Sequence, residues 1–382
     1  MTERINVMKP WLGTEEAAAV AETIASGWVA QGPRVAQFEA AFADRQQAPY
    51  AIATSSCTAA LHLALLVAGV GQGDDVVVPS LSFIATANAP TYAGARPVFA
   101  DVDPVTGNVT AATIEAAMTA RTTAVIIVDQ GGLPVDLEPI REVCDGRGVV
   151  LIEDAACAAG SSYRGRPVGV GADLATWSFH PRKLITTGEG GMITTGNRRW
   201  AERARTLREH AMSTSAADRH SVLLSPAEKY AEVGFNYRMT DLQAAVGLVQ
   251  LEKLDQLVNR RRALAARYRT ALVDIPGVRV VTDPPWGMSN FQSYWIELAA
   301  EFPLNREELL EKLASEGISA RRGIMAAHRQ PAYAAAELVT PLPNTERLTG
   351  HTIILPLYHQ LSVEDQQRVI DCLQAASGAE RS

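Results

Sequence analysis

Between residues 50 and 200, short apolar runs rich in β-branched residues alternate with amphipathic stretches. We expect buried strands at Tyr50–Thr54, Asp75–Pro79, Pro97–Ala100, Ala124–Val128 and Val149–Ile152, and helices beginning near Thr58, Phe83, Thr110 and Val135. This alternation predicts an α/β fold with a mostly parallel central sheet and helices on both faces. Such sheets bind ligands at the carboxyl ends of their strands, so residues that follow a strand are the first candidates for a site.

The pattern changes after Gly196. Long helical patterns cover Asn197–Glu209, Thr240–Leu257 and Arg260–Leu272. They are followed by a strand-like Ser293–Leu298, a helix at Asn305–Glu316, a strand at Ile318–Arg321 and a closing helix at Ser362–Ala376. We therefore predict a large domain over residues 1–255, which includes the N-terminal segment, and a smaller C-terminal α+β domain over residues 256–382.

The composition excludes several classes of protein. The chain has 382 residues, 20% of them charged, and a formal net charge of −7, so it is a poor candidate for binding nucleic acid or an anionic membrane. Its four cysteines form no CxxC pair and show no metal-ligand spacing, which predicts neither a disulfide framework nor a metal site. No segment resembles a signal peptide or is long enough to span a bilayer, so we expect a cytoplasmic protein.

Lys183 lies after a strand and before a glycine-rich turn, within the segment Trp177–Gly191. A ligand at the sheet edge can reach such a lysine, Ser178 and His180 add hydrogen-bonding groups beside it, and the glycines permit close backbone approach. The alternative is a solvated surface lysine, which is the usual state of this residue type.

Asp154 ends the apolar run that begins at Val149, and small residues follow it. A carboxylate in this position suits an ion pair with a protonated ring nitrogen that lies against the backbone. The alternative is an aspartate that caps the amino end of a helix.

Two further segments follow strands. In Thr54–Leu61 a strand leads directly into a helix, so the backbone N–H groups and the hydroxyls of Ser56 and Thr58 can hold a phosphate, although helix capping explains the segment equally well. Phe83, in Pro79–Thr86, can stack on a ligand ring or simply pack in the core.

An amine, a carboxylate, phosphate donors and an aromatic plate are what a pyridoxal-phosphate (PLP) enzyme requires of its protein. From Trp11 to Asp371 the chain resembles the DegT/DnrJ/EryC1/StrS family of sugar aminotransferases, which have the fold type I PLP-dependent architecture. The resemblance is carried in order by Ser26–Trp28, Gly32-Pro33, Phe38-Glu39, Ser56–Leu61, Pro79–Phe83, Gly94–Asp101, Glu153–Ala156, Ser178–Lys183, Gly188–Gly191, Gly234–Asp241 and Leu355–Tyr358.

The resemblance implies a role for each of these site residues. Lys183 is then the Schiff-base lysine and Asp154 the partner of the pyridinium nitrogen. Phe83 takes the ring-stacking position, and the phosphate is held by Ser178 and the amides of Cys57 and Thr58, beside Ser56. Asn236 matches a residue that reaches the phosphate of the neighbouring subunit, which implies a homodimer with shared active sites.

Two positions depart from the family pattern. The family usually has glutamine at position 157, near the ring oxygen of the cofactor, whereas this chain has Cys157, and a thiol is the weaker hydrogen-bond donor. A reactive cysteine is the alternative interpretation of Cys157, which the sequence disfavours because no cation is evidently paired with it. Asp129 stands where many members have histidine. Both changes indicate a subgroup whose substrate is not transferable from better-known members.

The chemistry that the resemblance implies is a ping-pong transamination from an amino acid, by family habit L-glutamate, to a keto sugar, nucleotide-linked in most of the family. Lys183 would move the proton between substrate and cofactor carbons, and burial is expected to lower the pKa of its amine toward neutrality. The alternatives are a keto-cyclitol aminotransferase, a PLP-dependent sugar dehydratase and a catalytically idle protein that keeps the fold. Lys183 argues against the dehydratase, in which histidine replaces the lysine.

Substrate contacts are harder to assign from the sequence. We expect them among His180, Arg238, Arg322 and His328, because arginine suits bidentate recognition of carboxylate or phosphate. The alternative is that several of these side chains form ordinary structural ion pairs.

Overall fold

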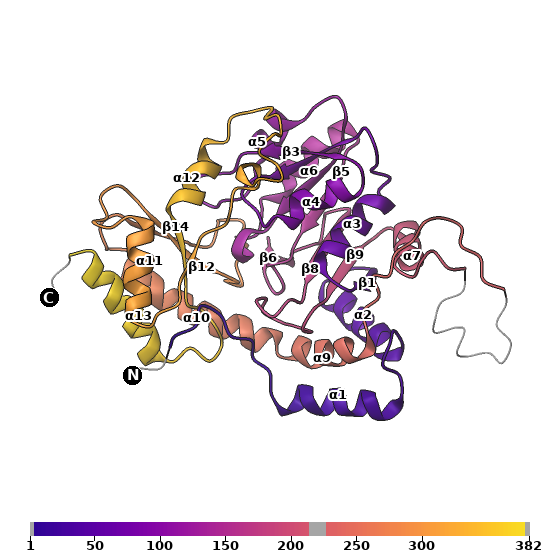
Figure 1. Ribbon diagram of the computed structural model, residues 1–382, viewed down its shortest axis with the longest axis horizontal. Helices are drawn as coiled ribbons and strands as arrows, with labels where there is room; N and C mark the ends of the chain where they lie inside the picture. Colours follow the sequence, from indigo (N-terminus) through magenta and orange to yellow (C-terminus); the bar gives the residue numbers. More distant parts are fainter. Residues whose placement is uncertain (1–3, 214–226, 379–382) are drawn as a thin grey trace.

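The computed structural model describes residues 4–213 and 227–378, and its centre is a seven-stranded sheet in the order β1-β9-β8-β5-β4-β2-β3 (Figure 1). The strands are β1 (Tyr50–Thr54), β2 (Asp75–Pro79), β3 (Arg96–Ala100), β4 (Thr122–Val128), β5 (Val150–Asp154), β8 (Leu174–Ser178) and β9 (Gly191–Thr195). Strand β9 is antiparallel to both β1 and β8, while the pairs β2–β3, β2–β4, β4–β5 and β5–β8 are parallel. The predicted mostly parallel sheet is therefore confirmed.

Alternate residues of each central strand face opposite layers of helices, as the two-residue period of a strand requires. Val76 and Val78 of β2 pack in the core under α3, α4 and α7, whereas Val77 packs in the core under α5, α6 and α10. The helices are α3 (Cys57–Val67), α4 (Ala85–Tyr92), α5 (Ala111–Ala117), α6 (Leu137–Arg147) and α7 (Arg198–Leu207). Helix α2 (Pro33–Arg45) contacts β1 and α9 (Asp241–Glu252), and α1 (Thr14–Ser26) packs on α9.

A smaller sheet in the order β10-β12-β14-β13 lies beside the central one. Its strands are β10 (Val278–Val280), β12 (Tyr294–Leu298), β13 (Arg321–Arg322) and β14 (Thr352–Leu355), with α11 (Arg306–Ser315), α12 (Pro343–His351) and α13 (Val363–Ala376) around it. Helix α10 (Leu254–Leu272) extends from these helices toward α9 (Figure 1). The predicted boundary between residues 255 and 256 falls in the first turn of α10, and the division into two domains stays a prediction.

A short three-stranded sheet, β11-β6-β7, connects the two regions through pairing of β11 (Gly287–Met288) with β6 (Ser162–Tyr163), which also pairs with β7 (Arg166–Pro167). Short 3-10 turns occur at Gln130–Gly132 and Ala327–Arg329. Within the described ranges, no helix combines the length and the apolar character needed to cross a membrane.

Several element boundaries differ from the sequence-based prediction, and two of these differences involve contacts between distant segments. The predicted junction near residue 258 lies instead at Lys253, whose N–H bonds to Gln250 O while its amine pairs with Glu16. The strand predicted at Ile318–Arg321 is β13 at Arg321–Arg322, because Ile318 pairs with Ile5 of the N-terminal segment. In both cases contacts with residues distant in sequence override the local pattern.

Candidate active site

Lys183 lies in the turn that follows β8, at the carboxyl end of the central sheet. Its backbone N–H donates to His180 O at 2.8 Å, and its amine donates to Cys157 Sγ at 3.0 Å. The side chain is half-buried and directed into the protein, so the surface-lysine alternative is wrong.

The charge of Lys183 differs from the expectation. Burial, the largest effect, lowers the pKa of the amine, but the Cys157 thiol, Cys57 and Asp154 together raise it above its ordinary value. The expected shift toward neutrality is therefore wrong for the cofactor-free chain, because negatively polarised groups surround the ammonium ion and stabilise it.

Asp154 ends β5 and is 5% exposed. Its carboxylate accepts hydrogen bonds from Thr86 Oγ1 at 2.9 Å and from the Ala156 N–H at 3.2 Å. Burial raises its pKa, while Thr86, Lys183 and Ala156 lower it. No helix begins after β5, so the helix-cap alternative is wrong. The hydrogen bonds to this carboxylate do not offset the cost of burying its charge, so a cationic ligand group beside it would be favourable.

The turn between β1 and α3 presents two free backbone N–H groups. Ser56 is the N-cap residue and accepts from the Ala59 N–H at 3.1 Å, while no described residue accepts from the N–H groups of Cys57 and Thr58. A Cβ at Gly191 would lie 2.4 Å from the Ser56 carbonyl carbon, so only glycine lets β9 pack against this turn. Helix capping and anion binding are therefore compatible here, because capping uses the Ala59 N–H and an anion would use the N–H groups of Cys57 and Thr58.

Phe83 and Ser178 flank the same edge. The Phe83 ring is 68% exposed, so the core-packing alternative is wrong and the ring is available to a ligand. Ser178 ends β8, two residues beyond Thr176, which is the neighbour of Asp154 across the β5–β8 pair. The Ser178 hydroxyl accepts a long hydrogen bond from the His180 N–H at 3.4 Å and keeps its own proton for an acceptor.

Asn236 lies on an exposed segment that passes the Cys57 turn, where the Ser55 N–H donates to Tyr237 O at 2.8 Å. The neighbouring Val233 is 85% exposed. An exposed amide beside an exposed apolar residue is compatible with the predicted contact with a second subunit, which stays a prediction.

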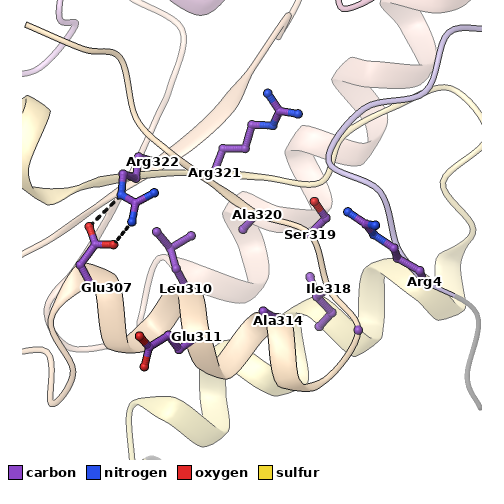
Figure 2. Close-up of a pocket in the computed structure, with 11 residues that line it drawn as sticks. Arg4, Glu307, Leu310, Glu311, Ala314, Ile318, Ser319, Ala320, Arg321 and Arg322 are labelled. Atoms are coloured by element: carbon purple, nitrogen blue, oxygen red, sulfur yellow. Dashed lines mark hydrogen bonds and ion pairs between the residues drawn. The ribbon is translucent and has the colours of Figure 1, made fainter.

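The four predicted substrate residues are not brought together. His180 precedes Lys183 by three residues, and Arg238 follows Tyr237, whose carbonyl accepts from the Ser55 N–H; both side chains are half-buried. His328 is buried, with its Nδ1 2.6 Å from Ser80 Oγ. Arg322 forms a bidentate pair with Glu307 in an open groove of about 800 Å³ between α11 and β13, and Lys183 does not line this groove (Figure 2). Glu307 already satisfies the Arg322 guanidinium, so the geometry gives no support for its predicted role.

The two unusual positions lie just beyond the carboxyl ends of β4 and β5. Cys157 contacts the lysine amine, which overturns the inference that no cation is paired with this thiol. Asp129 is fully buried at the end of β4; burial, and then the charge of Glu153, raise its pKa well above the ordinary value. One Asp129 oxygen accepts from the Val135 N–H at 3.0 Å, and the other is buried and has no hydrogen-bond partner among the described residues.

Sequence reasoning missed Thr86 and Glu153. Thr86 lies in the first turn of α4, three residues after Phe83, but only the fold shows that it donates to Asp154. Glu153 precedes Asp154 and points to the opposite face of β5, where it accepts from the Gly169 N–H at 2.9 Å.

The groups at this edge fit one cofactor. A half-buried amine, a buried carboxylate without a full set of donors, two unpaired N–H groups at a helix start and an exposed phenyl ring match an aldehyde, a ring nitrogen, a phosphate and an aromatic ring face. The described residues therefore offer a partner for every functional part of PLP.

Comparison with known proteins agrees with this geometry. The model of the DegT/DnrJ/EryC1/StrS aminotransferase family matches residues 10–374. The chain belongs to this family. Among solved structures, the aminotransferase TlmJ from Streptoalloteichus hindustanus is 38% identical, with 98% of this chain and 99% of TlmJ covered and a TM-score of 0.91.

Two further members of the comparison bear on the ligands. DesI, solved in the presence of its TDP-sugar product, is 31% identical over 99% of this chain and 95% of DesI, with a TM-score of 0.90. Spr1654 from Streptococcus pneumoniae, solved in a PLP form, is 26% identical over 98% of this chain and 99% of that protein, with a TM-score of 0.91. This member of the DegT/DnrJ/EryC1/StrS family is thus a PLP-dependent aminotransferase of fold type I.

Glu153 gives a testable pH dependence to this family member. Burial, the largest effect, raises its pKa from 4.5 to about 7, against the Gly169 N–H and Asp129, which lower it. A carboxyl group whose pKa is raised in the folded state contributes its full stabilisation when the pH is below its pKa in the unfolded chain. This contribution is lost as the pH rises through the folded-state pKa of about 7. The free energy of unfolding of the wild type is therefore expected to fall by on the order of 3 kcal/mol between about pH 4.5 and pH 7. In Glu153→Gln, which has no carboxyl group at this position, this fall should be absent.

Urea unfolding of both proteins at about pH 5 and about pH 8 measures this difference. Asp75→Asn is the matched control of opposite sign, because the Arg96 guanidinium lowers the pKa of Asp75 to about 2 and its effect is confined to acid. Parallel pH profiles for wild type and Glu153→Gln would contradict the prediction.

Proposed function

We propose that this enzyme transfers an amino group from L-glutamate to the ketone of a nucleotide-linked sugar, in a ping-pong reaction at the Lys183 edge. The observation that carries the proposal is the convergence of the Lys183 amine, the buried Asp154 carboxylate and the free N–H groups of Cys57 and Thr58. These groups come from the start of α3, the end of β5 and the turn after β8, and they meet only because these segments lie at one edge of the sheet.

PLP, when bound, supplies the electron-withdrawing ring that allows a proton to leave the carbon next to the amine. Asp154 would hold a proton on the ring nitrogen, because its carboxylate is buried and needs a cation. Lys183 Nζ would attach the cofactor and, once released, carry the proton between the two carbons. The N–H groups of Cys57 and Thr58 and the hydroxyl of Ser178 would hold the phosphate, and the exposed Phe83 ring would cover one face of the ring.

Cys157 would orient the Lys183 amine before and after that proton transfer. Its sulfur lies 3.0 Å from Lys183 Nζ, so it fixes the direction of the amine in the cofactor-free chain. Thr86 would orient the Asp154 carboxylate from the opposite side, by a hydrogen bond of 2.9 Å.

The acceptor and the assembly are proposed from the family and from the surface. DesI was solved with a TDP-sugar product, which supports a nucleotide-linked keto sugar over a keto-cyclitol. We propose a homodimer in which Asn236 reaches the phosphate of the other subunit; its exposure beside Val233 supports this. The four cysteines are all free, which supports a cytoplasmic location.

Absorbance tests the proposed function directly. The purified holoenzyme is expected to show the visible absorbance of lysine-bound PLP, to lose it on addition of L-glutamate with release of 2-oxoglutarate, and to regain it with a nucleotide keto sugar. A panel that includes keto-cyclitols identifies the acceptor, and light scattering gives the mass of the assembly. A holoenzyme that L-glutamate leaves unchanged would rule out the proposed donor.

A further inference from the structure

A cavity of about 380 Å³ adjoins the Lys183 turn and contains none of the groups assigned to the cofactor. One wall is the turn His180–Arg182, a second is the loop Gln292-Ser293, and Arg321 of β13 forms a third. Apolar side chains of the N-terminal segment and of β14, including Met8 and Leu355, close the remaining side. The cavity is thus cationic on one side and apolar on the other.

The cationic side consists of two arginines, Arg182 and Arg321, that have no acidic partner among the described residues. Burial, and then the positive charge of Arg182, lower the pKa of Arg321, so the two guanidinium groups lie close enough to repel each other. Neither forms an ion pair with any residue in 4–213 or 227–378. By contrast, Figure 2 shows Arg322 turned toward Glu307 and Arg321 directed away from it. Two neighbouring guanidinium groups without a carboxylate favour an anionic ligand between them.

Gln292 supplies an independent observation. Its side chain is 8% exposed and lines the cavity, and its Nε2 donates to Arg182 O at 2.6 Å. Its Oε1 is buried and accepts no hydrogen bond from the described residues. A buried amide oxygen without a donor is costly, so this atom favours a ligand that brings an N–H or O–H group.

The cavity is connected to the reactive lysine on two sides. Lys183 follows Arg182 directly, and its N–H donates to His180 O at 2.8 Å. On the other side, Asn290 of the Gln292 loop donates to Cys157 O at 2.8 Å, and Cys157 contacts the lysine amine. A ligand in the cavity therefore lies next to the groups that handle the amine.

We propose that Arg182, Arg321 and Gln292 form the subsite that holds a carboxylate of the amino-acid donor, an inference that rests on the proposed function. The α-carbon of a donor must reach Lys183, so its carboxylates lie within a few bonds of that amine, whereas the diphosphate of a nucleotide sugar lies beyond the sugar ring. At about 30 Å³ per water, the cavity holds roughly a dozen waters, which suits an amino acid and is small for a nucleotide sugar. The apolar wall covers the methylene groups of the donor.

Glutarate, an unreactive dicarboxylate, tests the subsite without requiring turnover. Calorimetric titration of the PLP-loaded protein is expected to give a dissociation constant for glutarate that rises about 10- to 100-fold in Arg182→Gln and in Arg321→Gln. Arg322→Gln is the matched control, since Glu307 already engages that guanidinium, and it should bind glutarate as the wild type does. Thymidine diphosphate is titrated in parallel, and its affinity should be unchanged in all three variants.

Three outcomes would contradict the proposal that these residues bind the donor carboxylate. Unchanged glutarate affinity in the two variants, absence of glutarate binding to the wild type, or an equal loss of thymidine diphosphate binding would each do so, the last by assigning the arginines to a diphosphate. Far-ultraviolet circular dichroism confirms that each variant is folded. Failure of L-glutamate to react with the wild type concerns the proposed function alone, because glutarate binding is measured separately.

Discussion

Replacing Lys183 with alanine is expected to leave a folded protein that still binds PLP but turns over about 10²- to 10⁴-fold more slowly. The phosphate donors and Asp154 remain in this variant, so cofactor affinity has separate support, whereas the amine that attaches the cofactor and moves the proton is gone. The visible absorbance of the lysine–cofactor Schiff base should disappear, and a steady-state assay with L-glutamate measures the loss in turnover.

Two comparisons separate the chemical role of Lys183 from a structural one. A small primary amine added to Lys183→Ala should restore part of the turnover, because it can enter the space of the missing side chain and accept the proton. Lys253→Ala is the control lysine: its amine pairs with Glu16, so its removal should lower the free energy of unfolding and leave turnover unchanged. Full activity in Lys183→Ala would show that the assignment is wrong.

Replacing Asp154 with asparagine should reduce turnover by roughly 100- to 5,000-fold, because removal of one partner of a buried ion pair costs about 3–5 kcal/mol. The hydrogen bonds around it can survive, since an amide oxygen can accept from the Ala156 N–H and an amide N–H₂ can donate to Thr86. The variant is therefore expected to fold well.

The unfolding measurement sharpens this prediction for Asp154. Burial raises the pKa of the carboxyl in the cofactor-free protein, so the apo form of Asp154→Asn should be at least as stable as the wild type near neutral pH. Glu153→Gln, one residue earlier on the opposite face of β5, serves as the control and should retain activity. Loss of stability together with activity in Asp154→Asn would indicate a structural residue instead.

Much of the fold follows from patterns that are local in the chain. Strands β1 and β2 have the bounds that their apolar runs predict, and Asp154 ends a strand as expected, because burial on both faces selects continuous β-branched runs. The rule that ligands meet the carboxyl ends of parallel strands then places Lys183 and Asp154 at one edge.

Pairings across the sheet could not be predicted in the same way. Thr86 and Asp154 are 68 residues apart, and they meet because β4 and β5 are neighbours in the sheet and α4 precedes them on one face. The same limitation explains Arg322, whose sequence context suggests anion binding but whose guanidinium is taken by Glu307 of α11.

The sequence by itself determined the family and the class of fold, and it predicted Lys183 and Asp154 as the reactive pair, because these depend on strand ends and motif order along the chain. Only the tertiary structure decided what surrounds that pair: the Cys157 thiol against the lysine amine, the buried carboxyl groups of Asp129 and Glu153 with raised pKa values, and Arg182 and Arg321, which form no ion pair within the described residues. The physical reason is that charge and hydrogen-bond partners are set by distance in space, and strand order, which the local pattern leaves open, sets those distances.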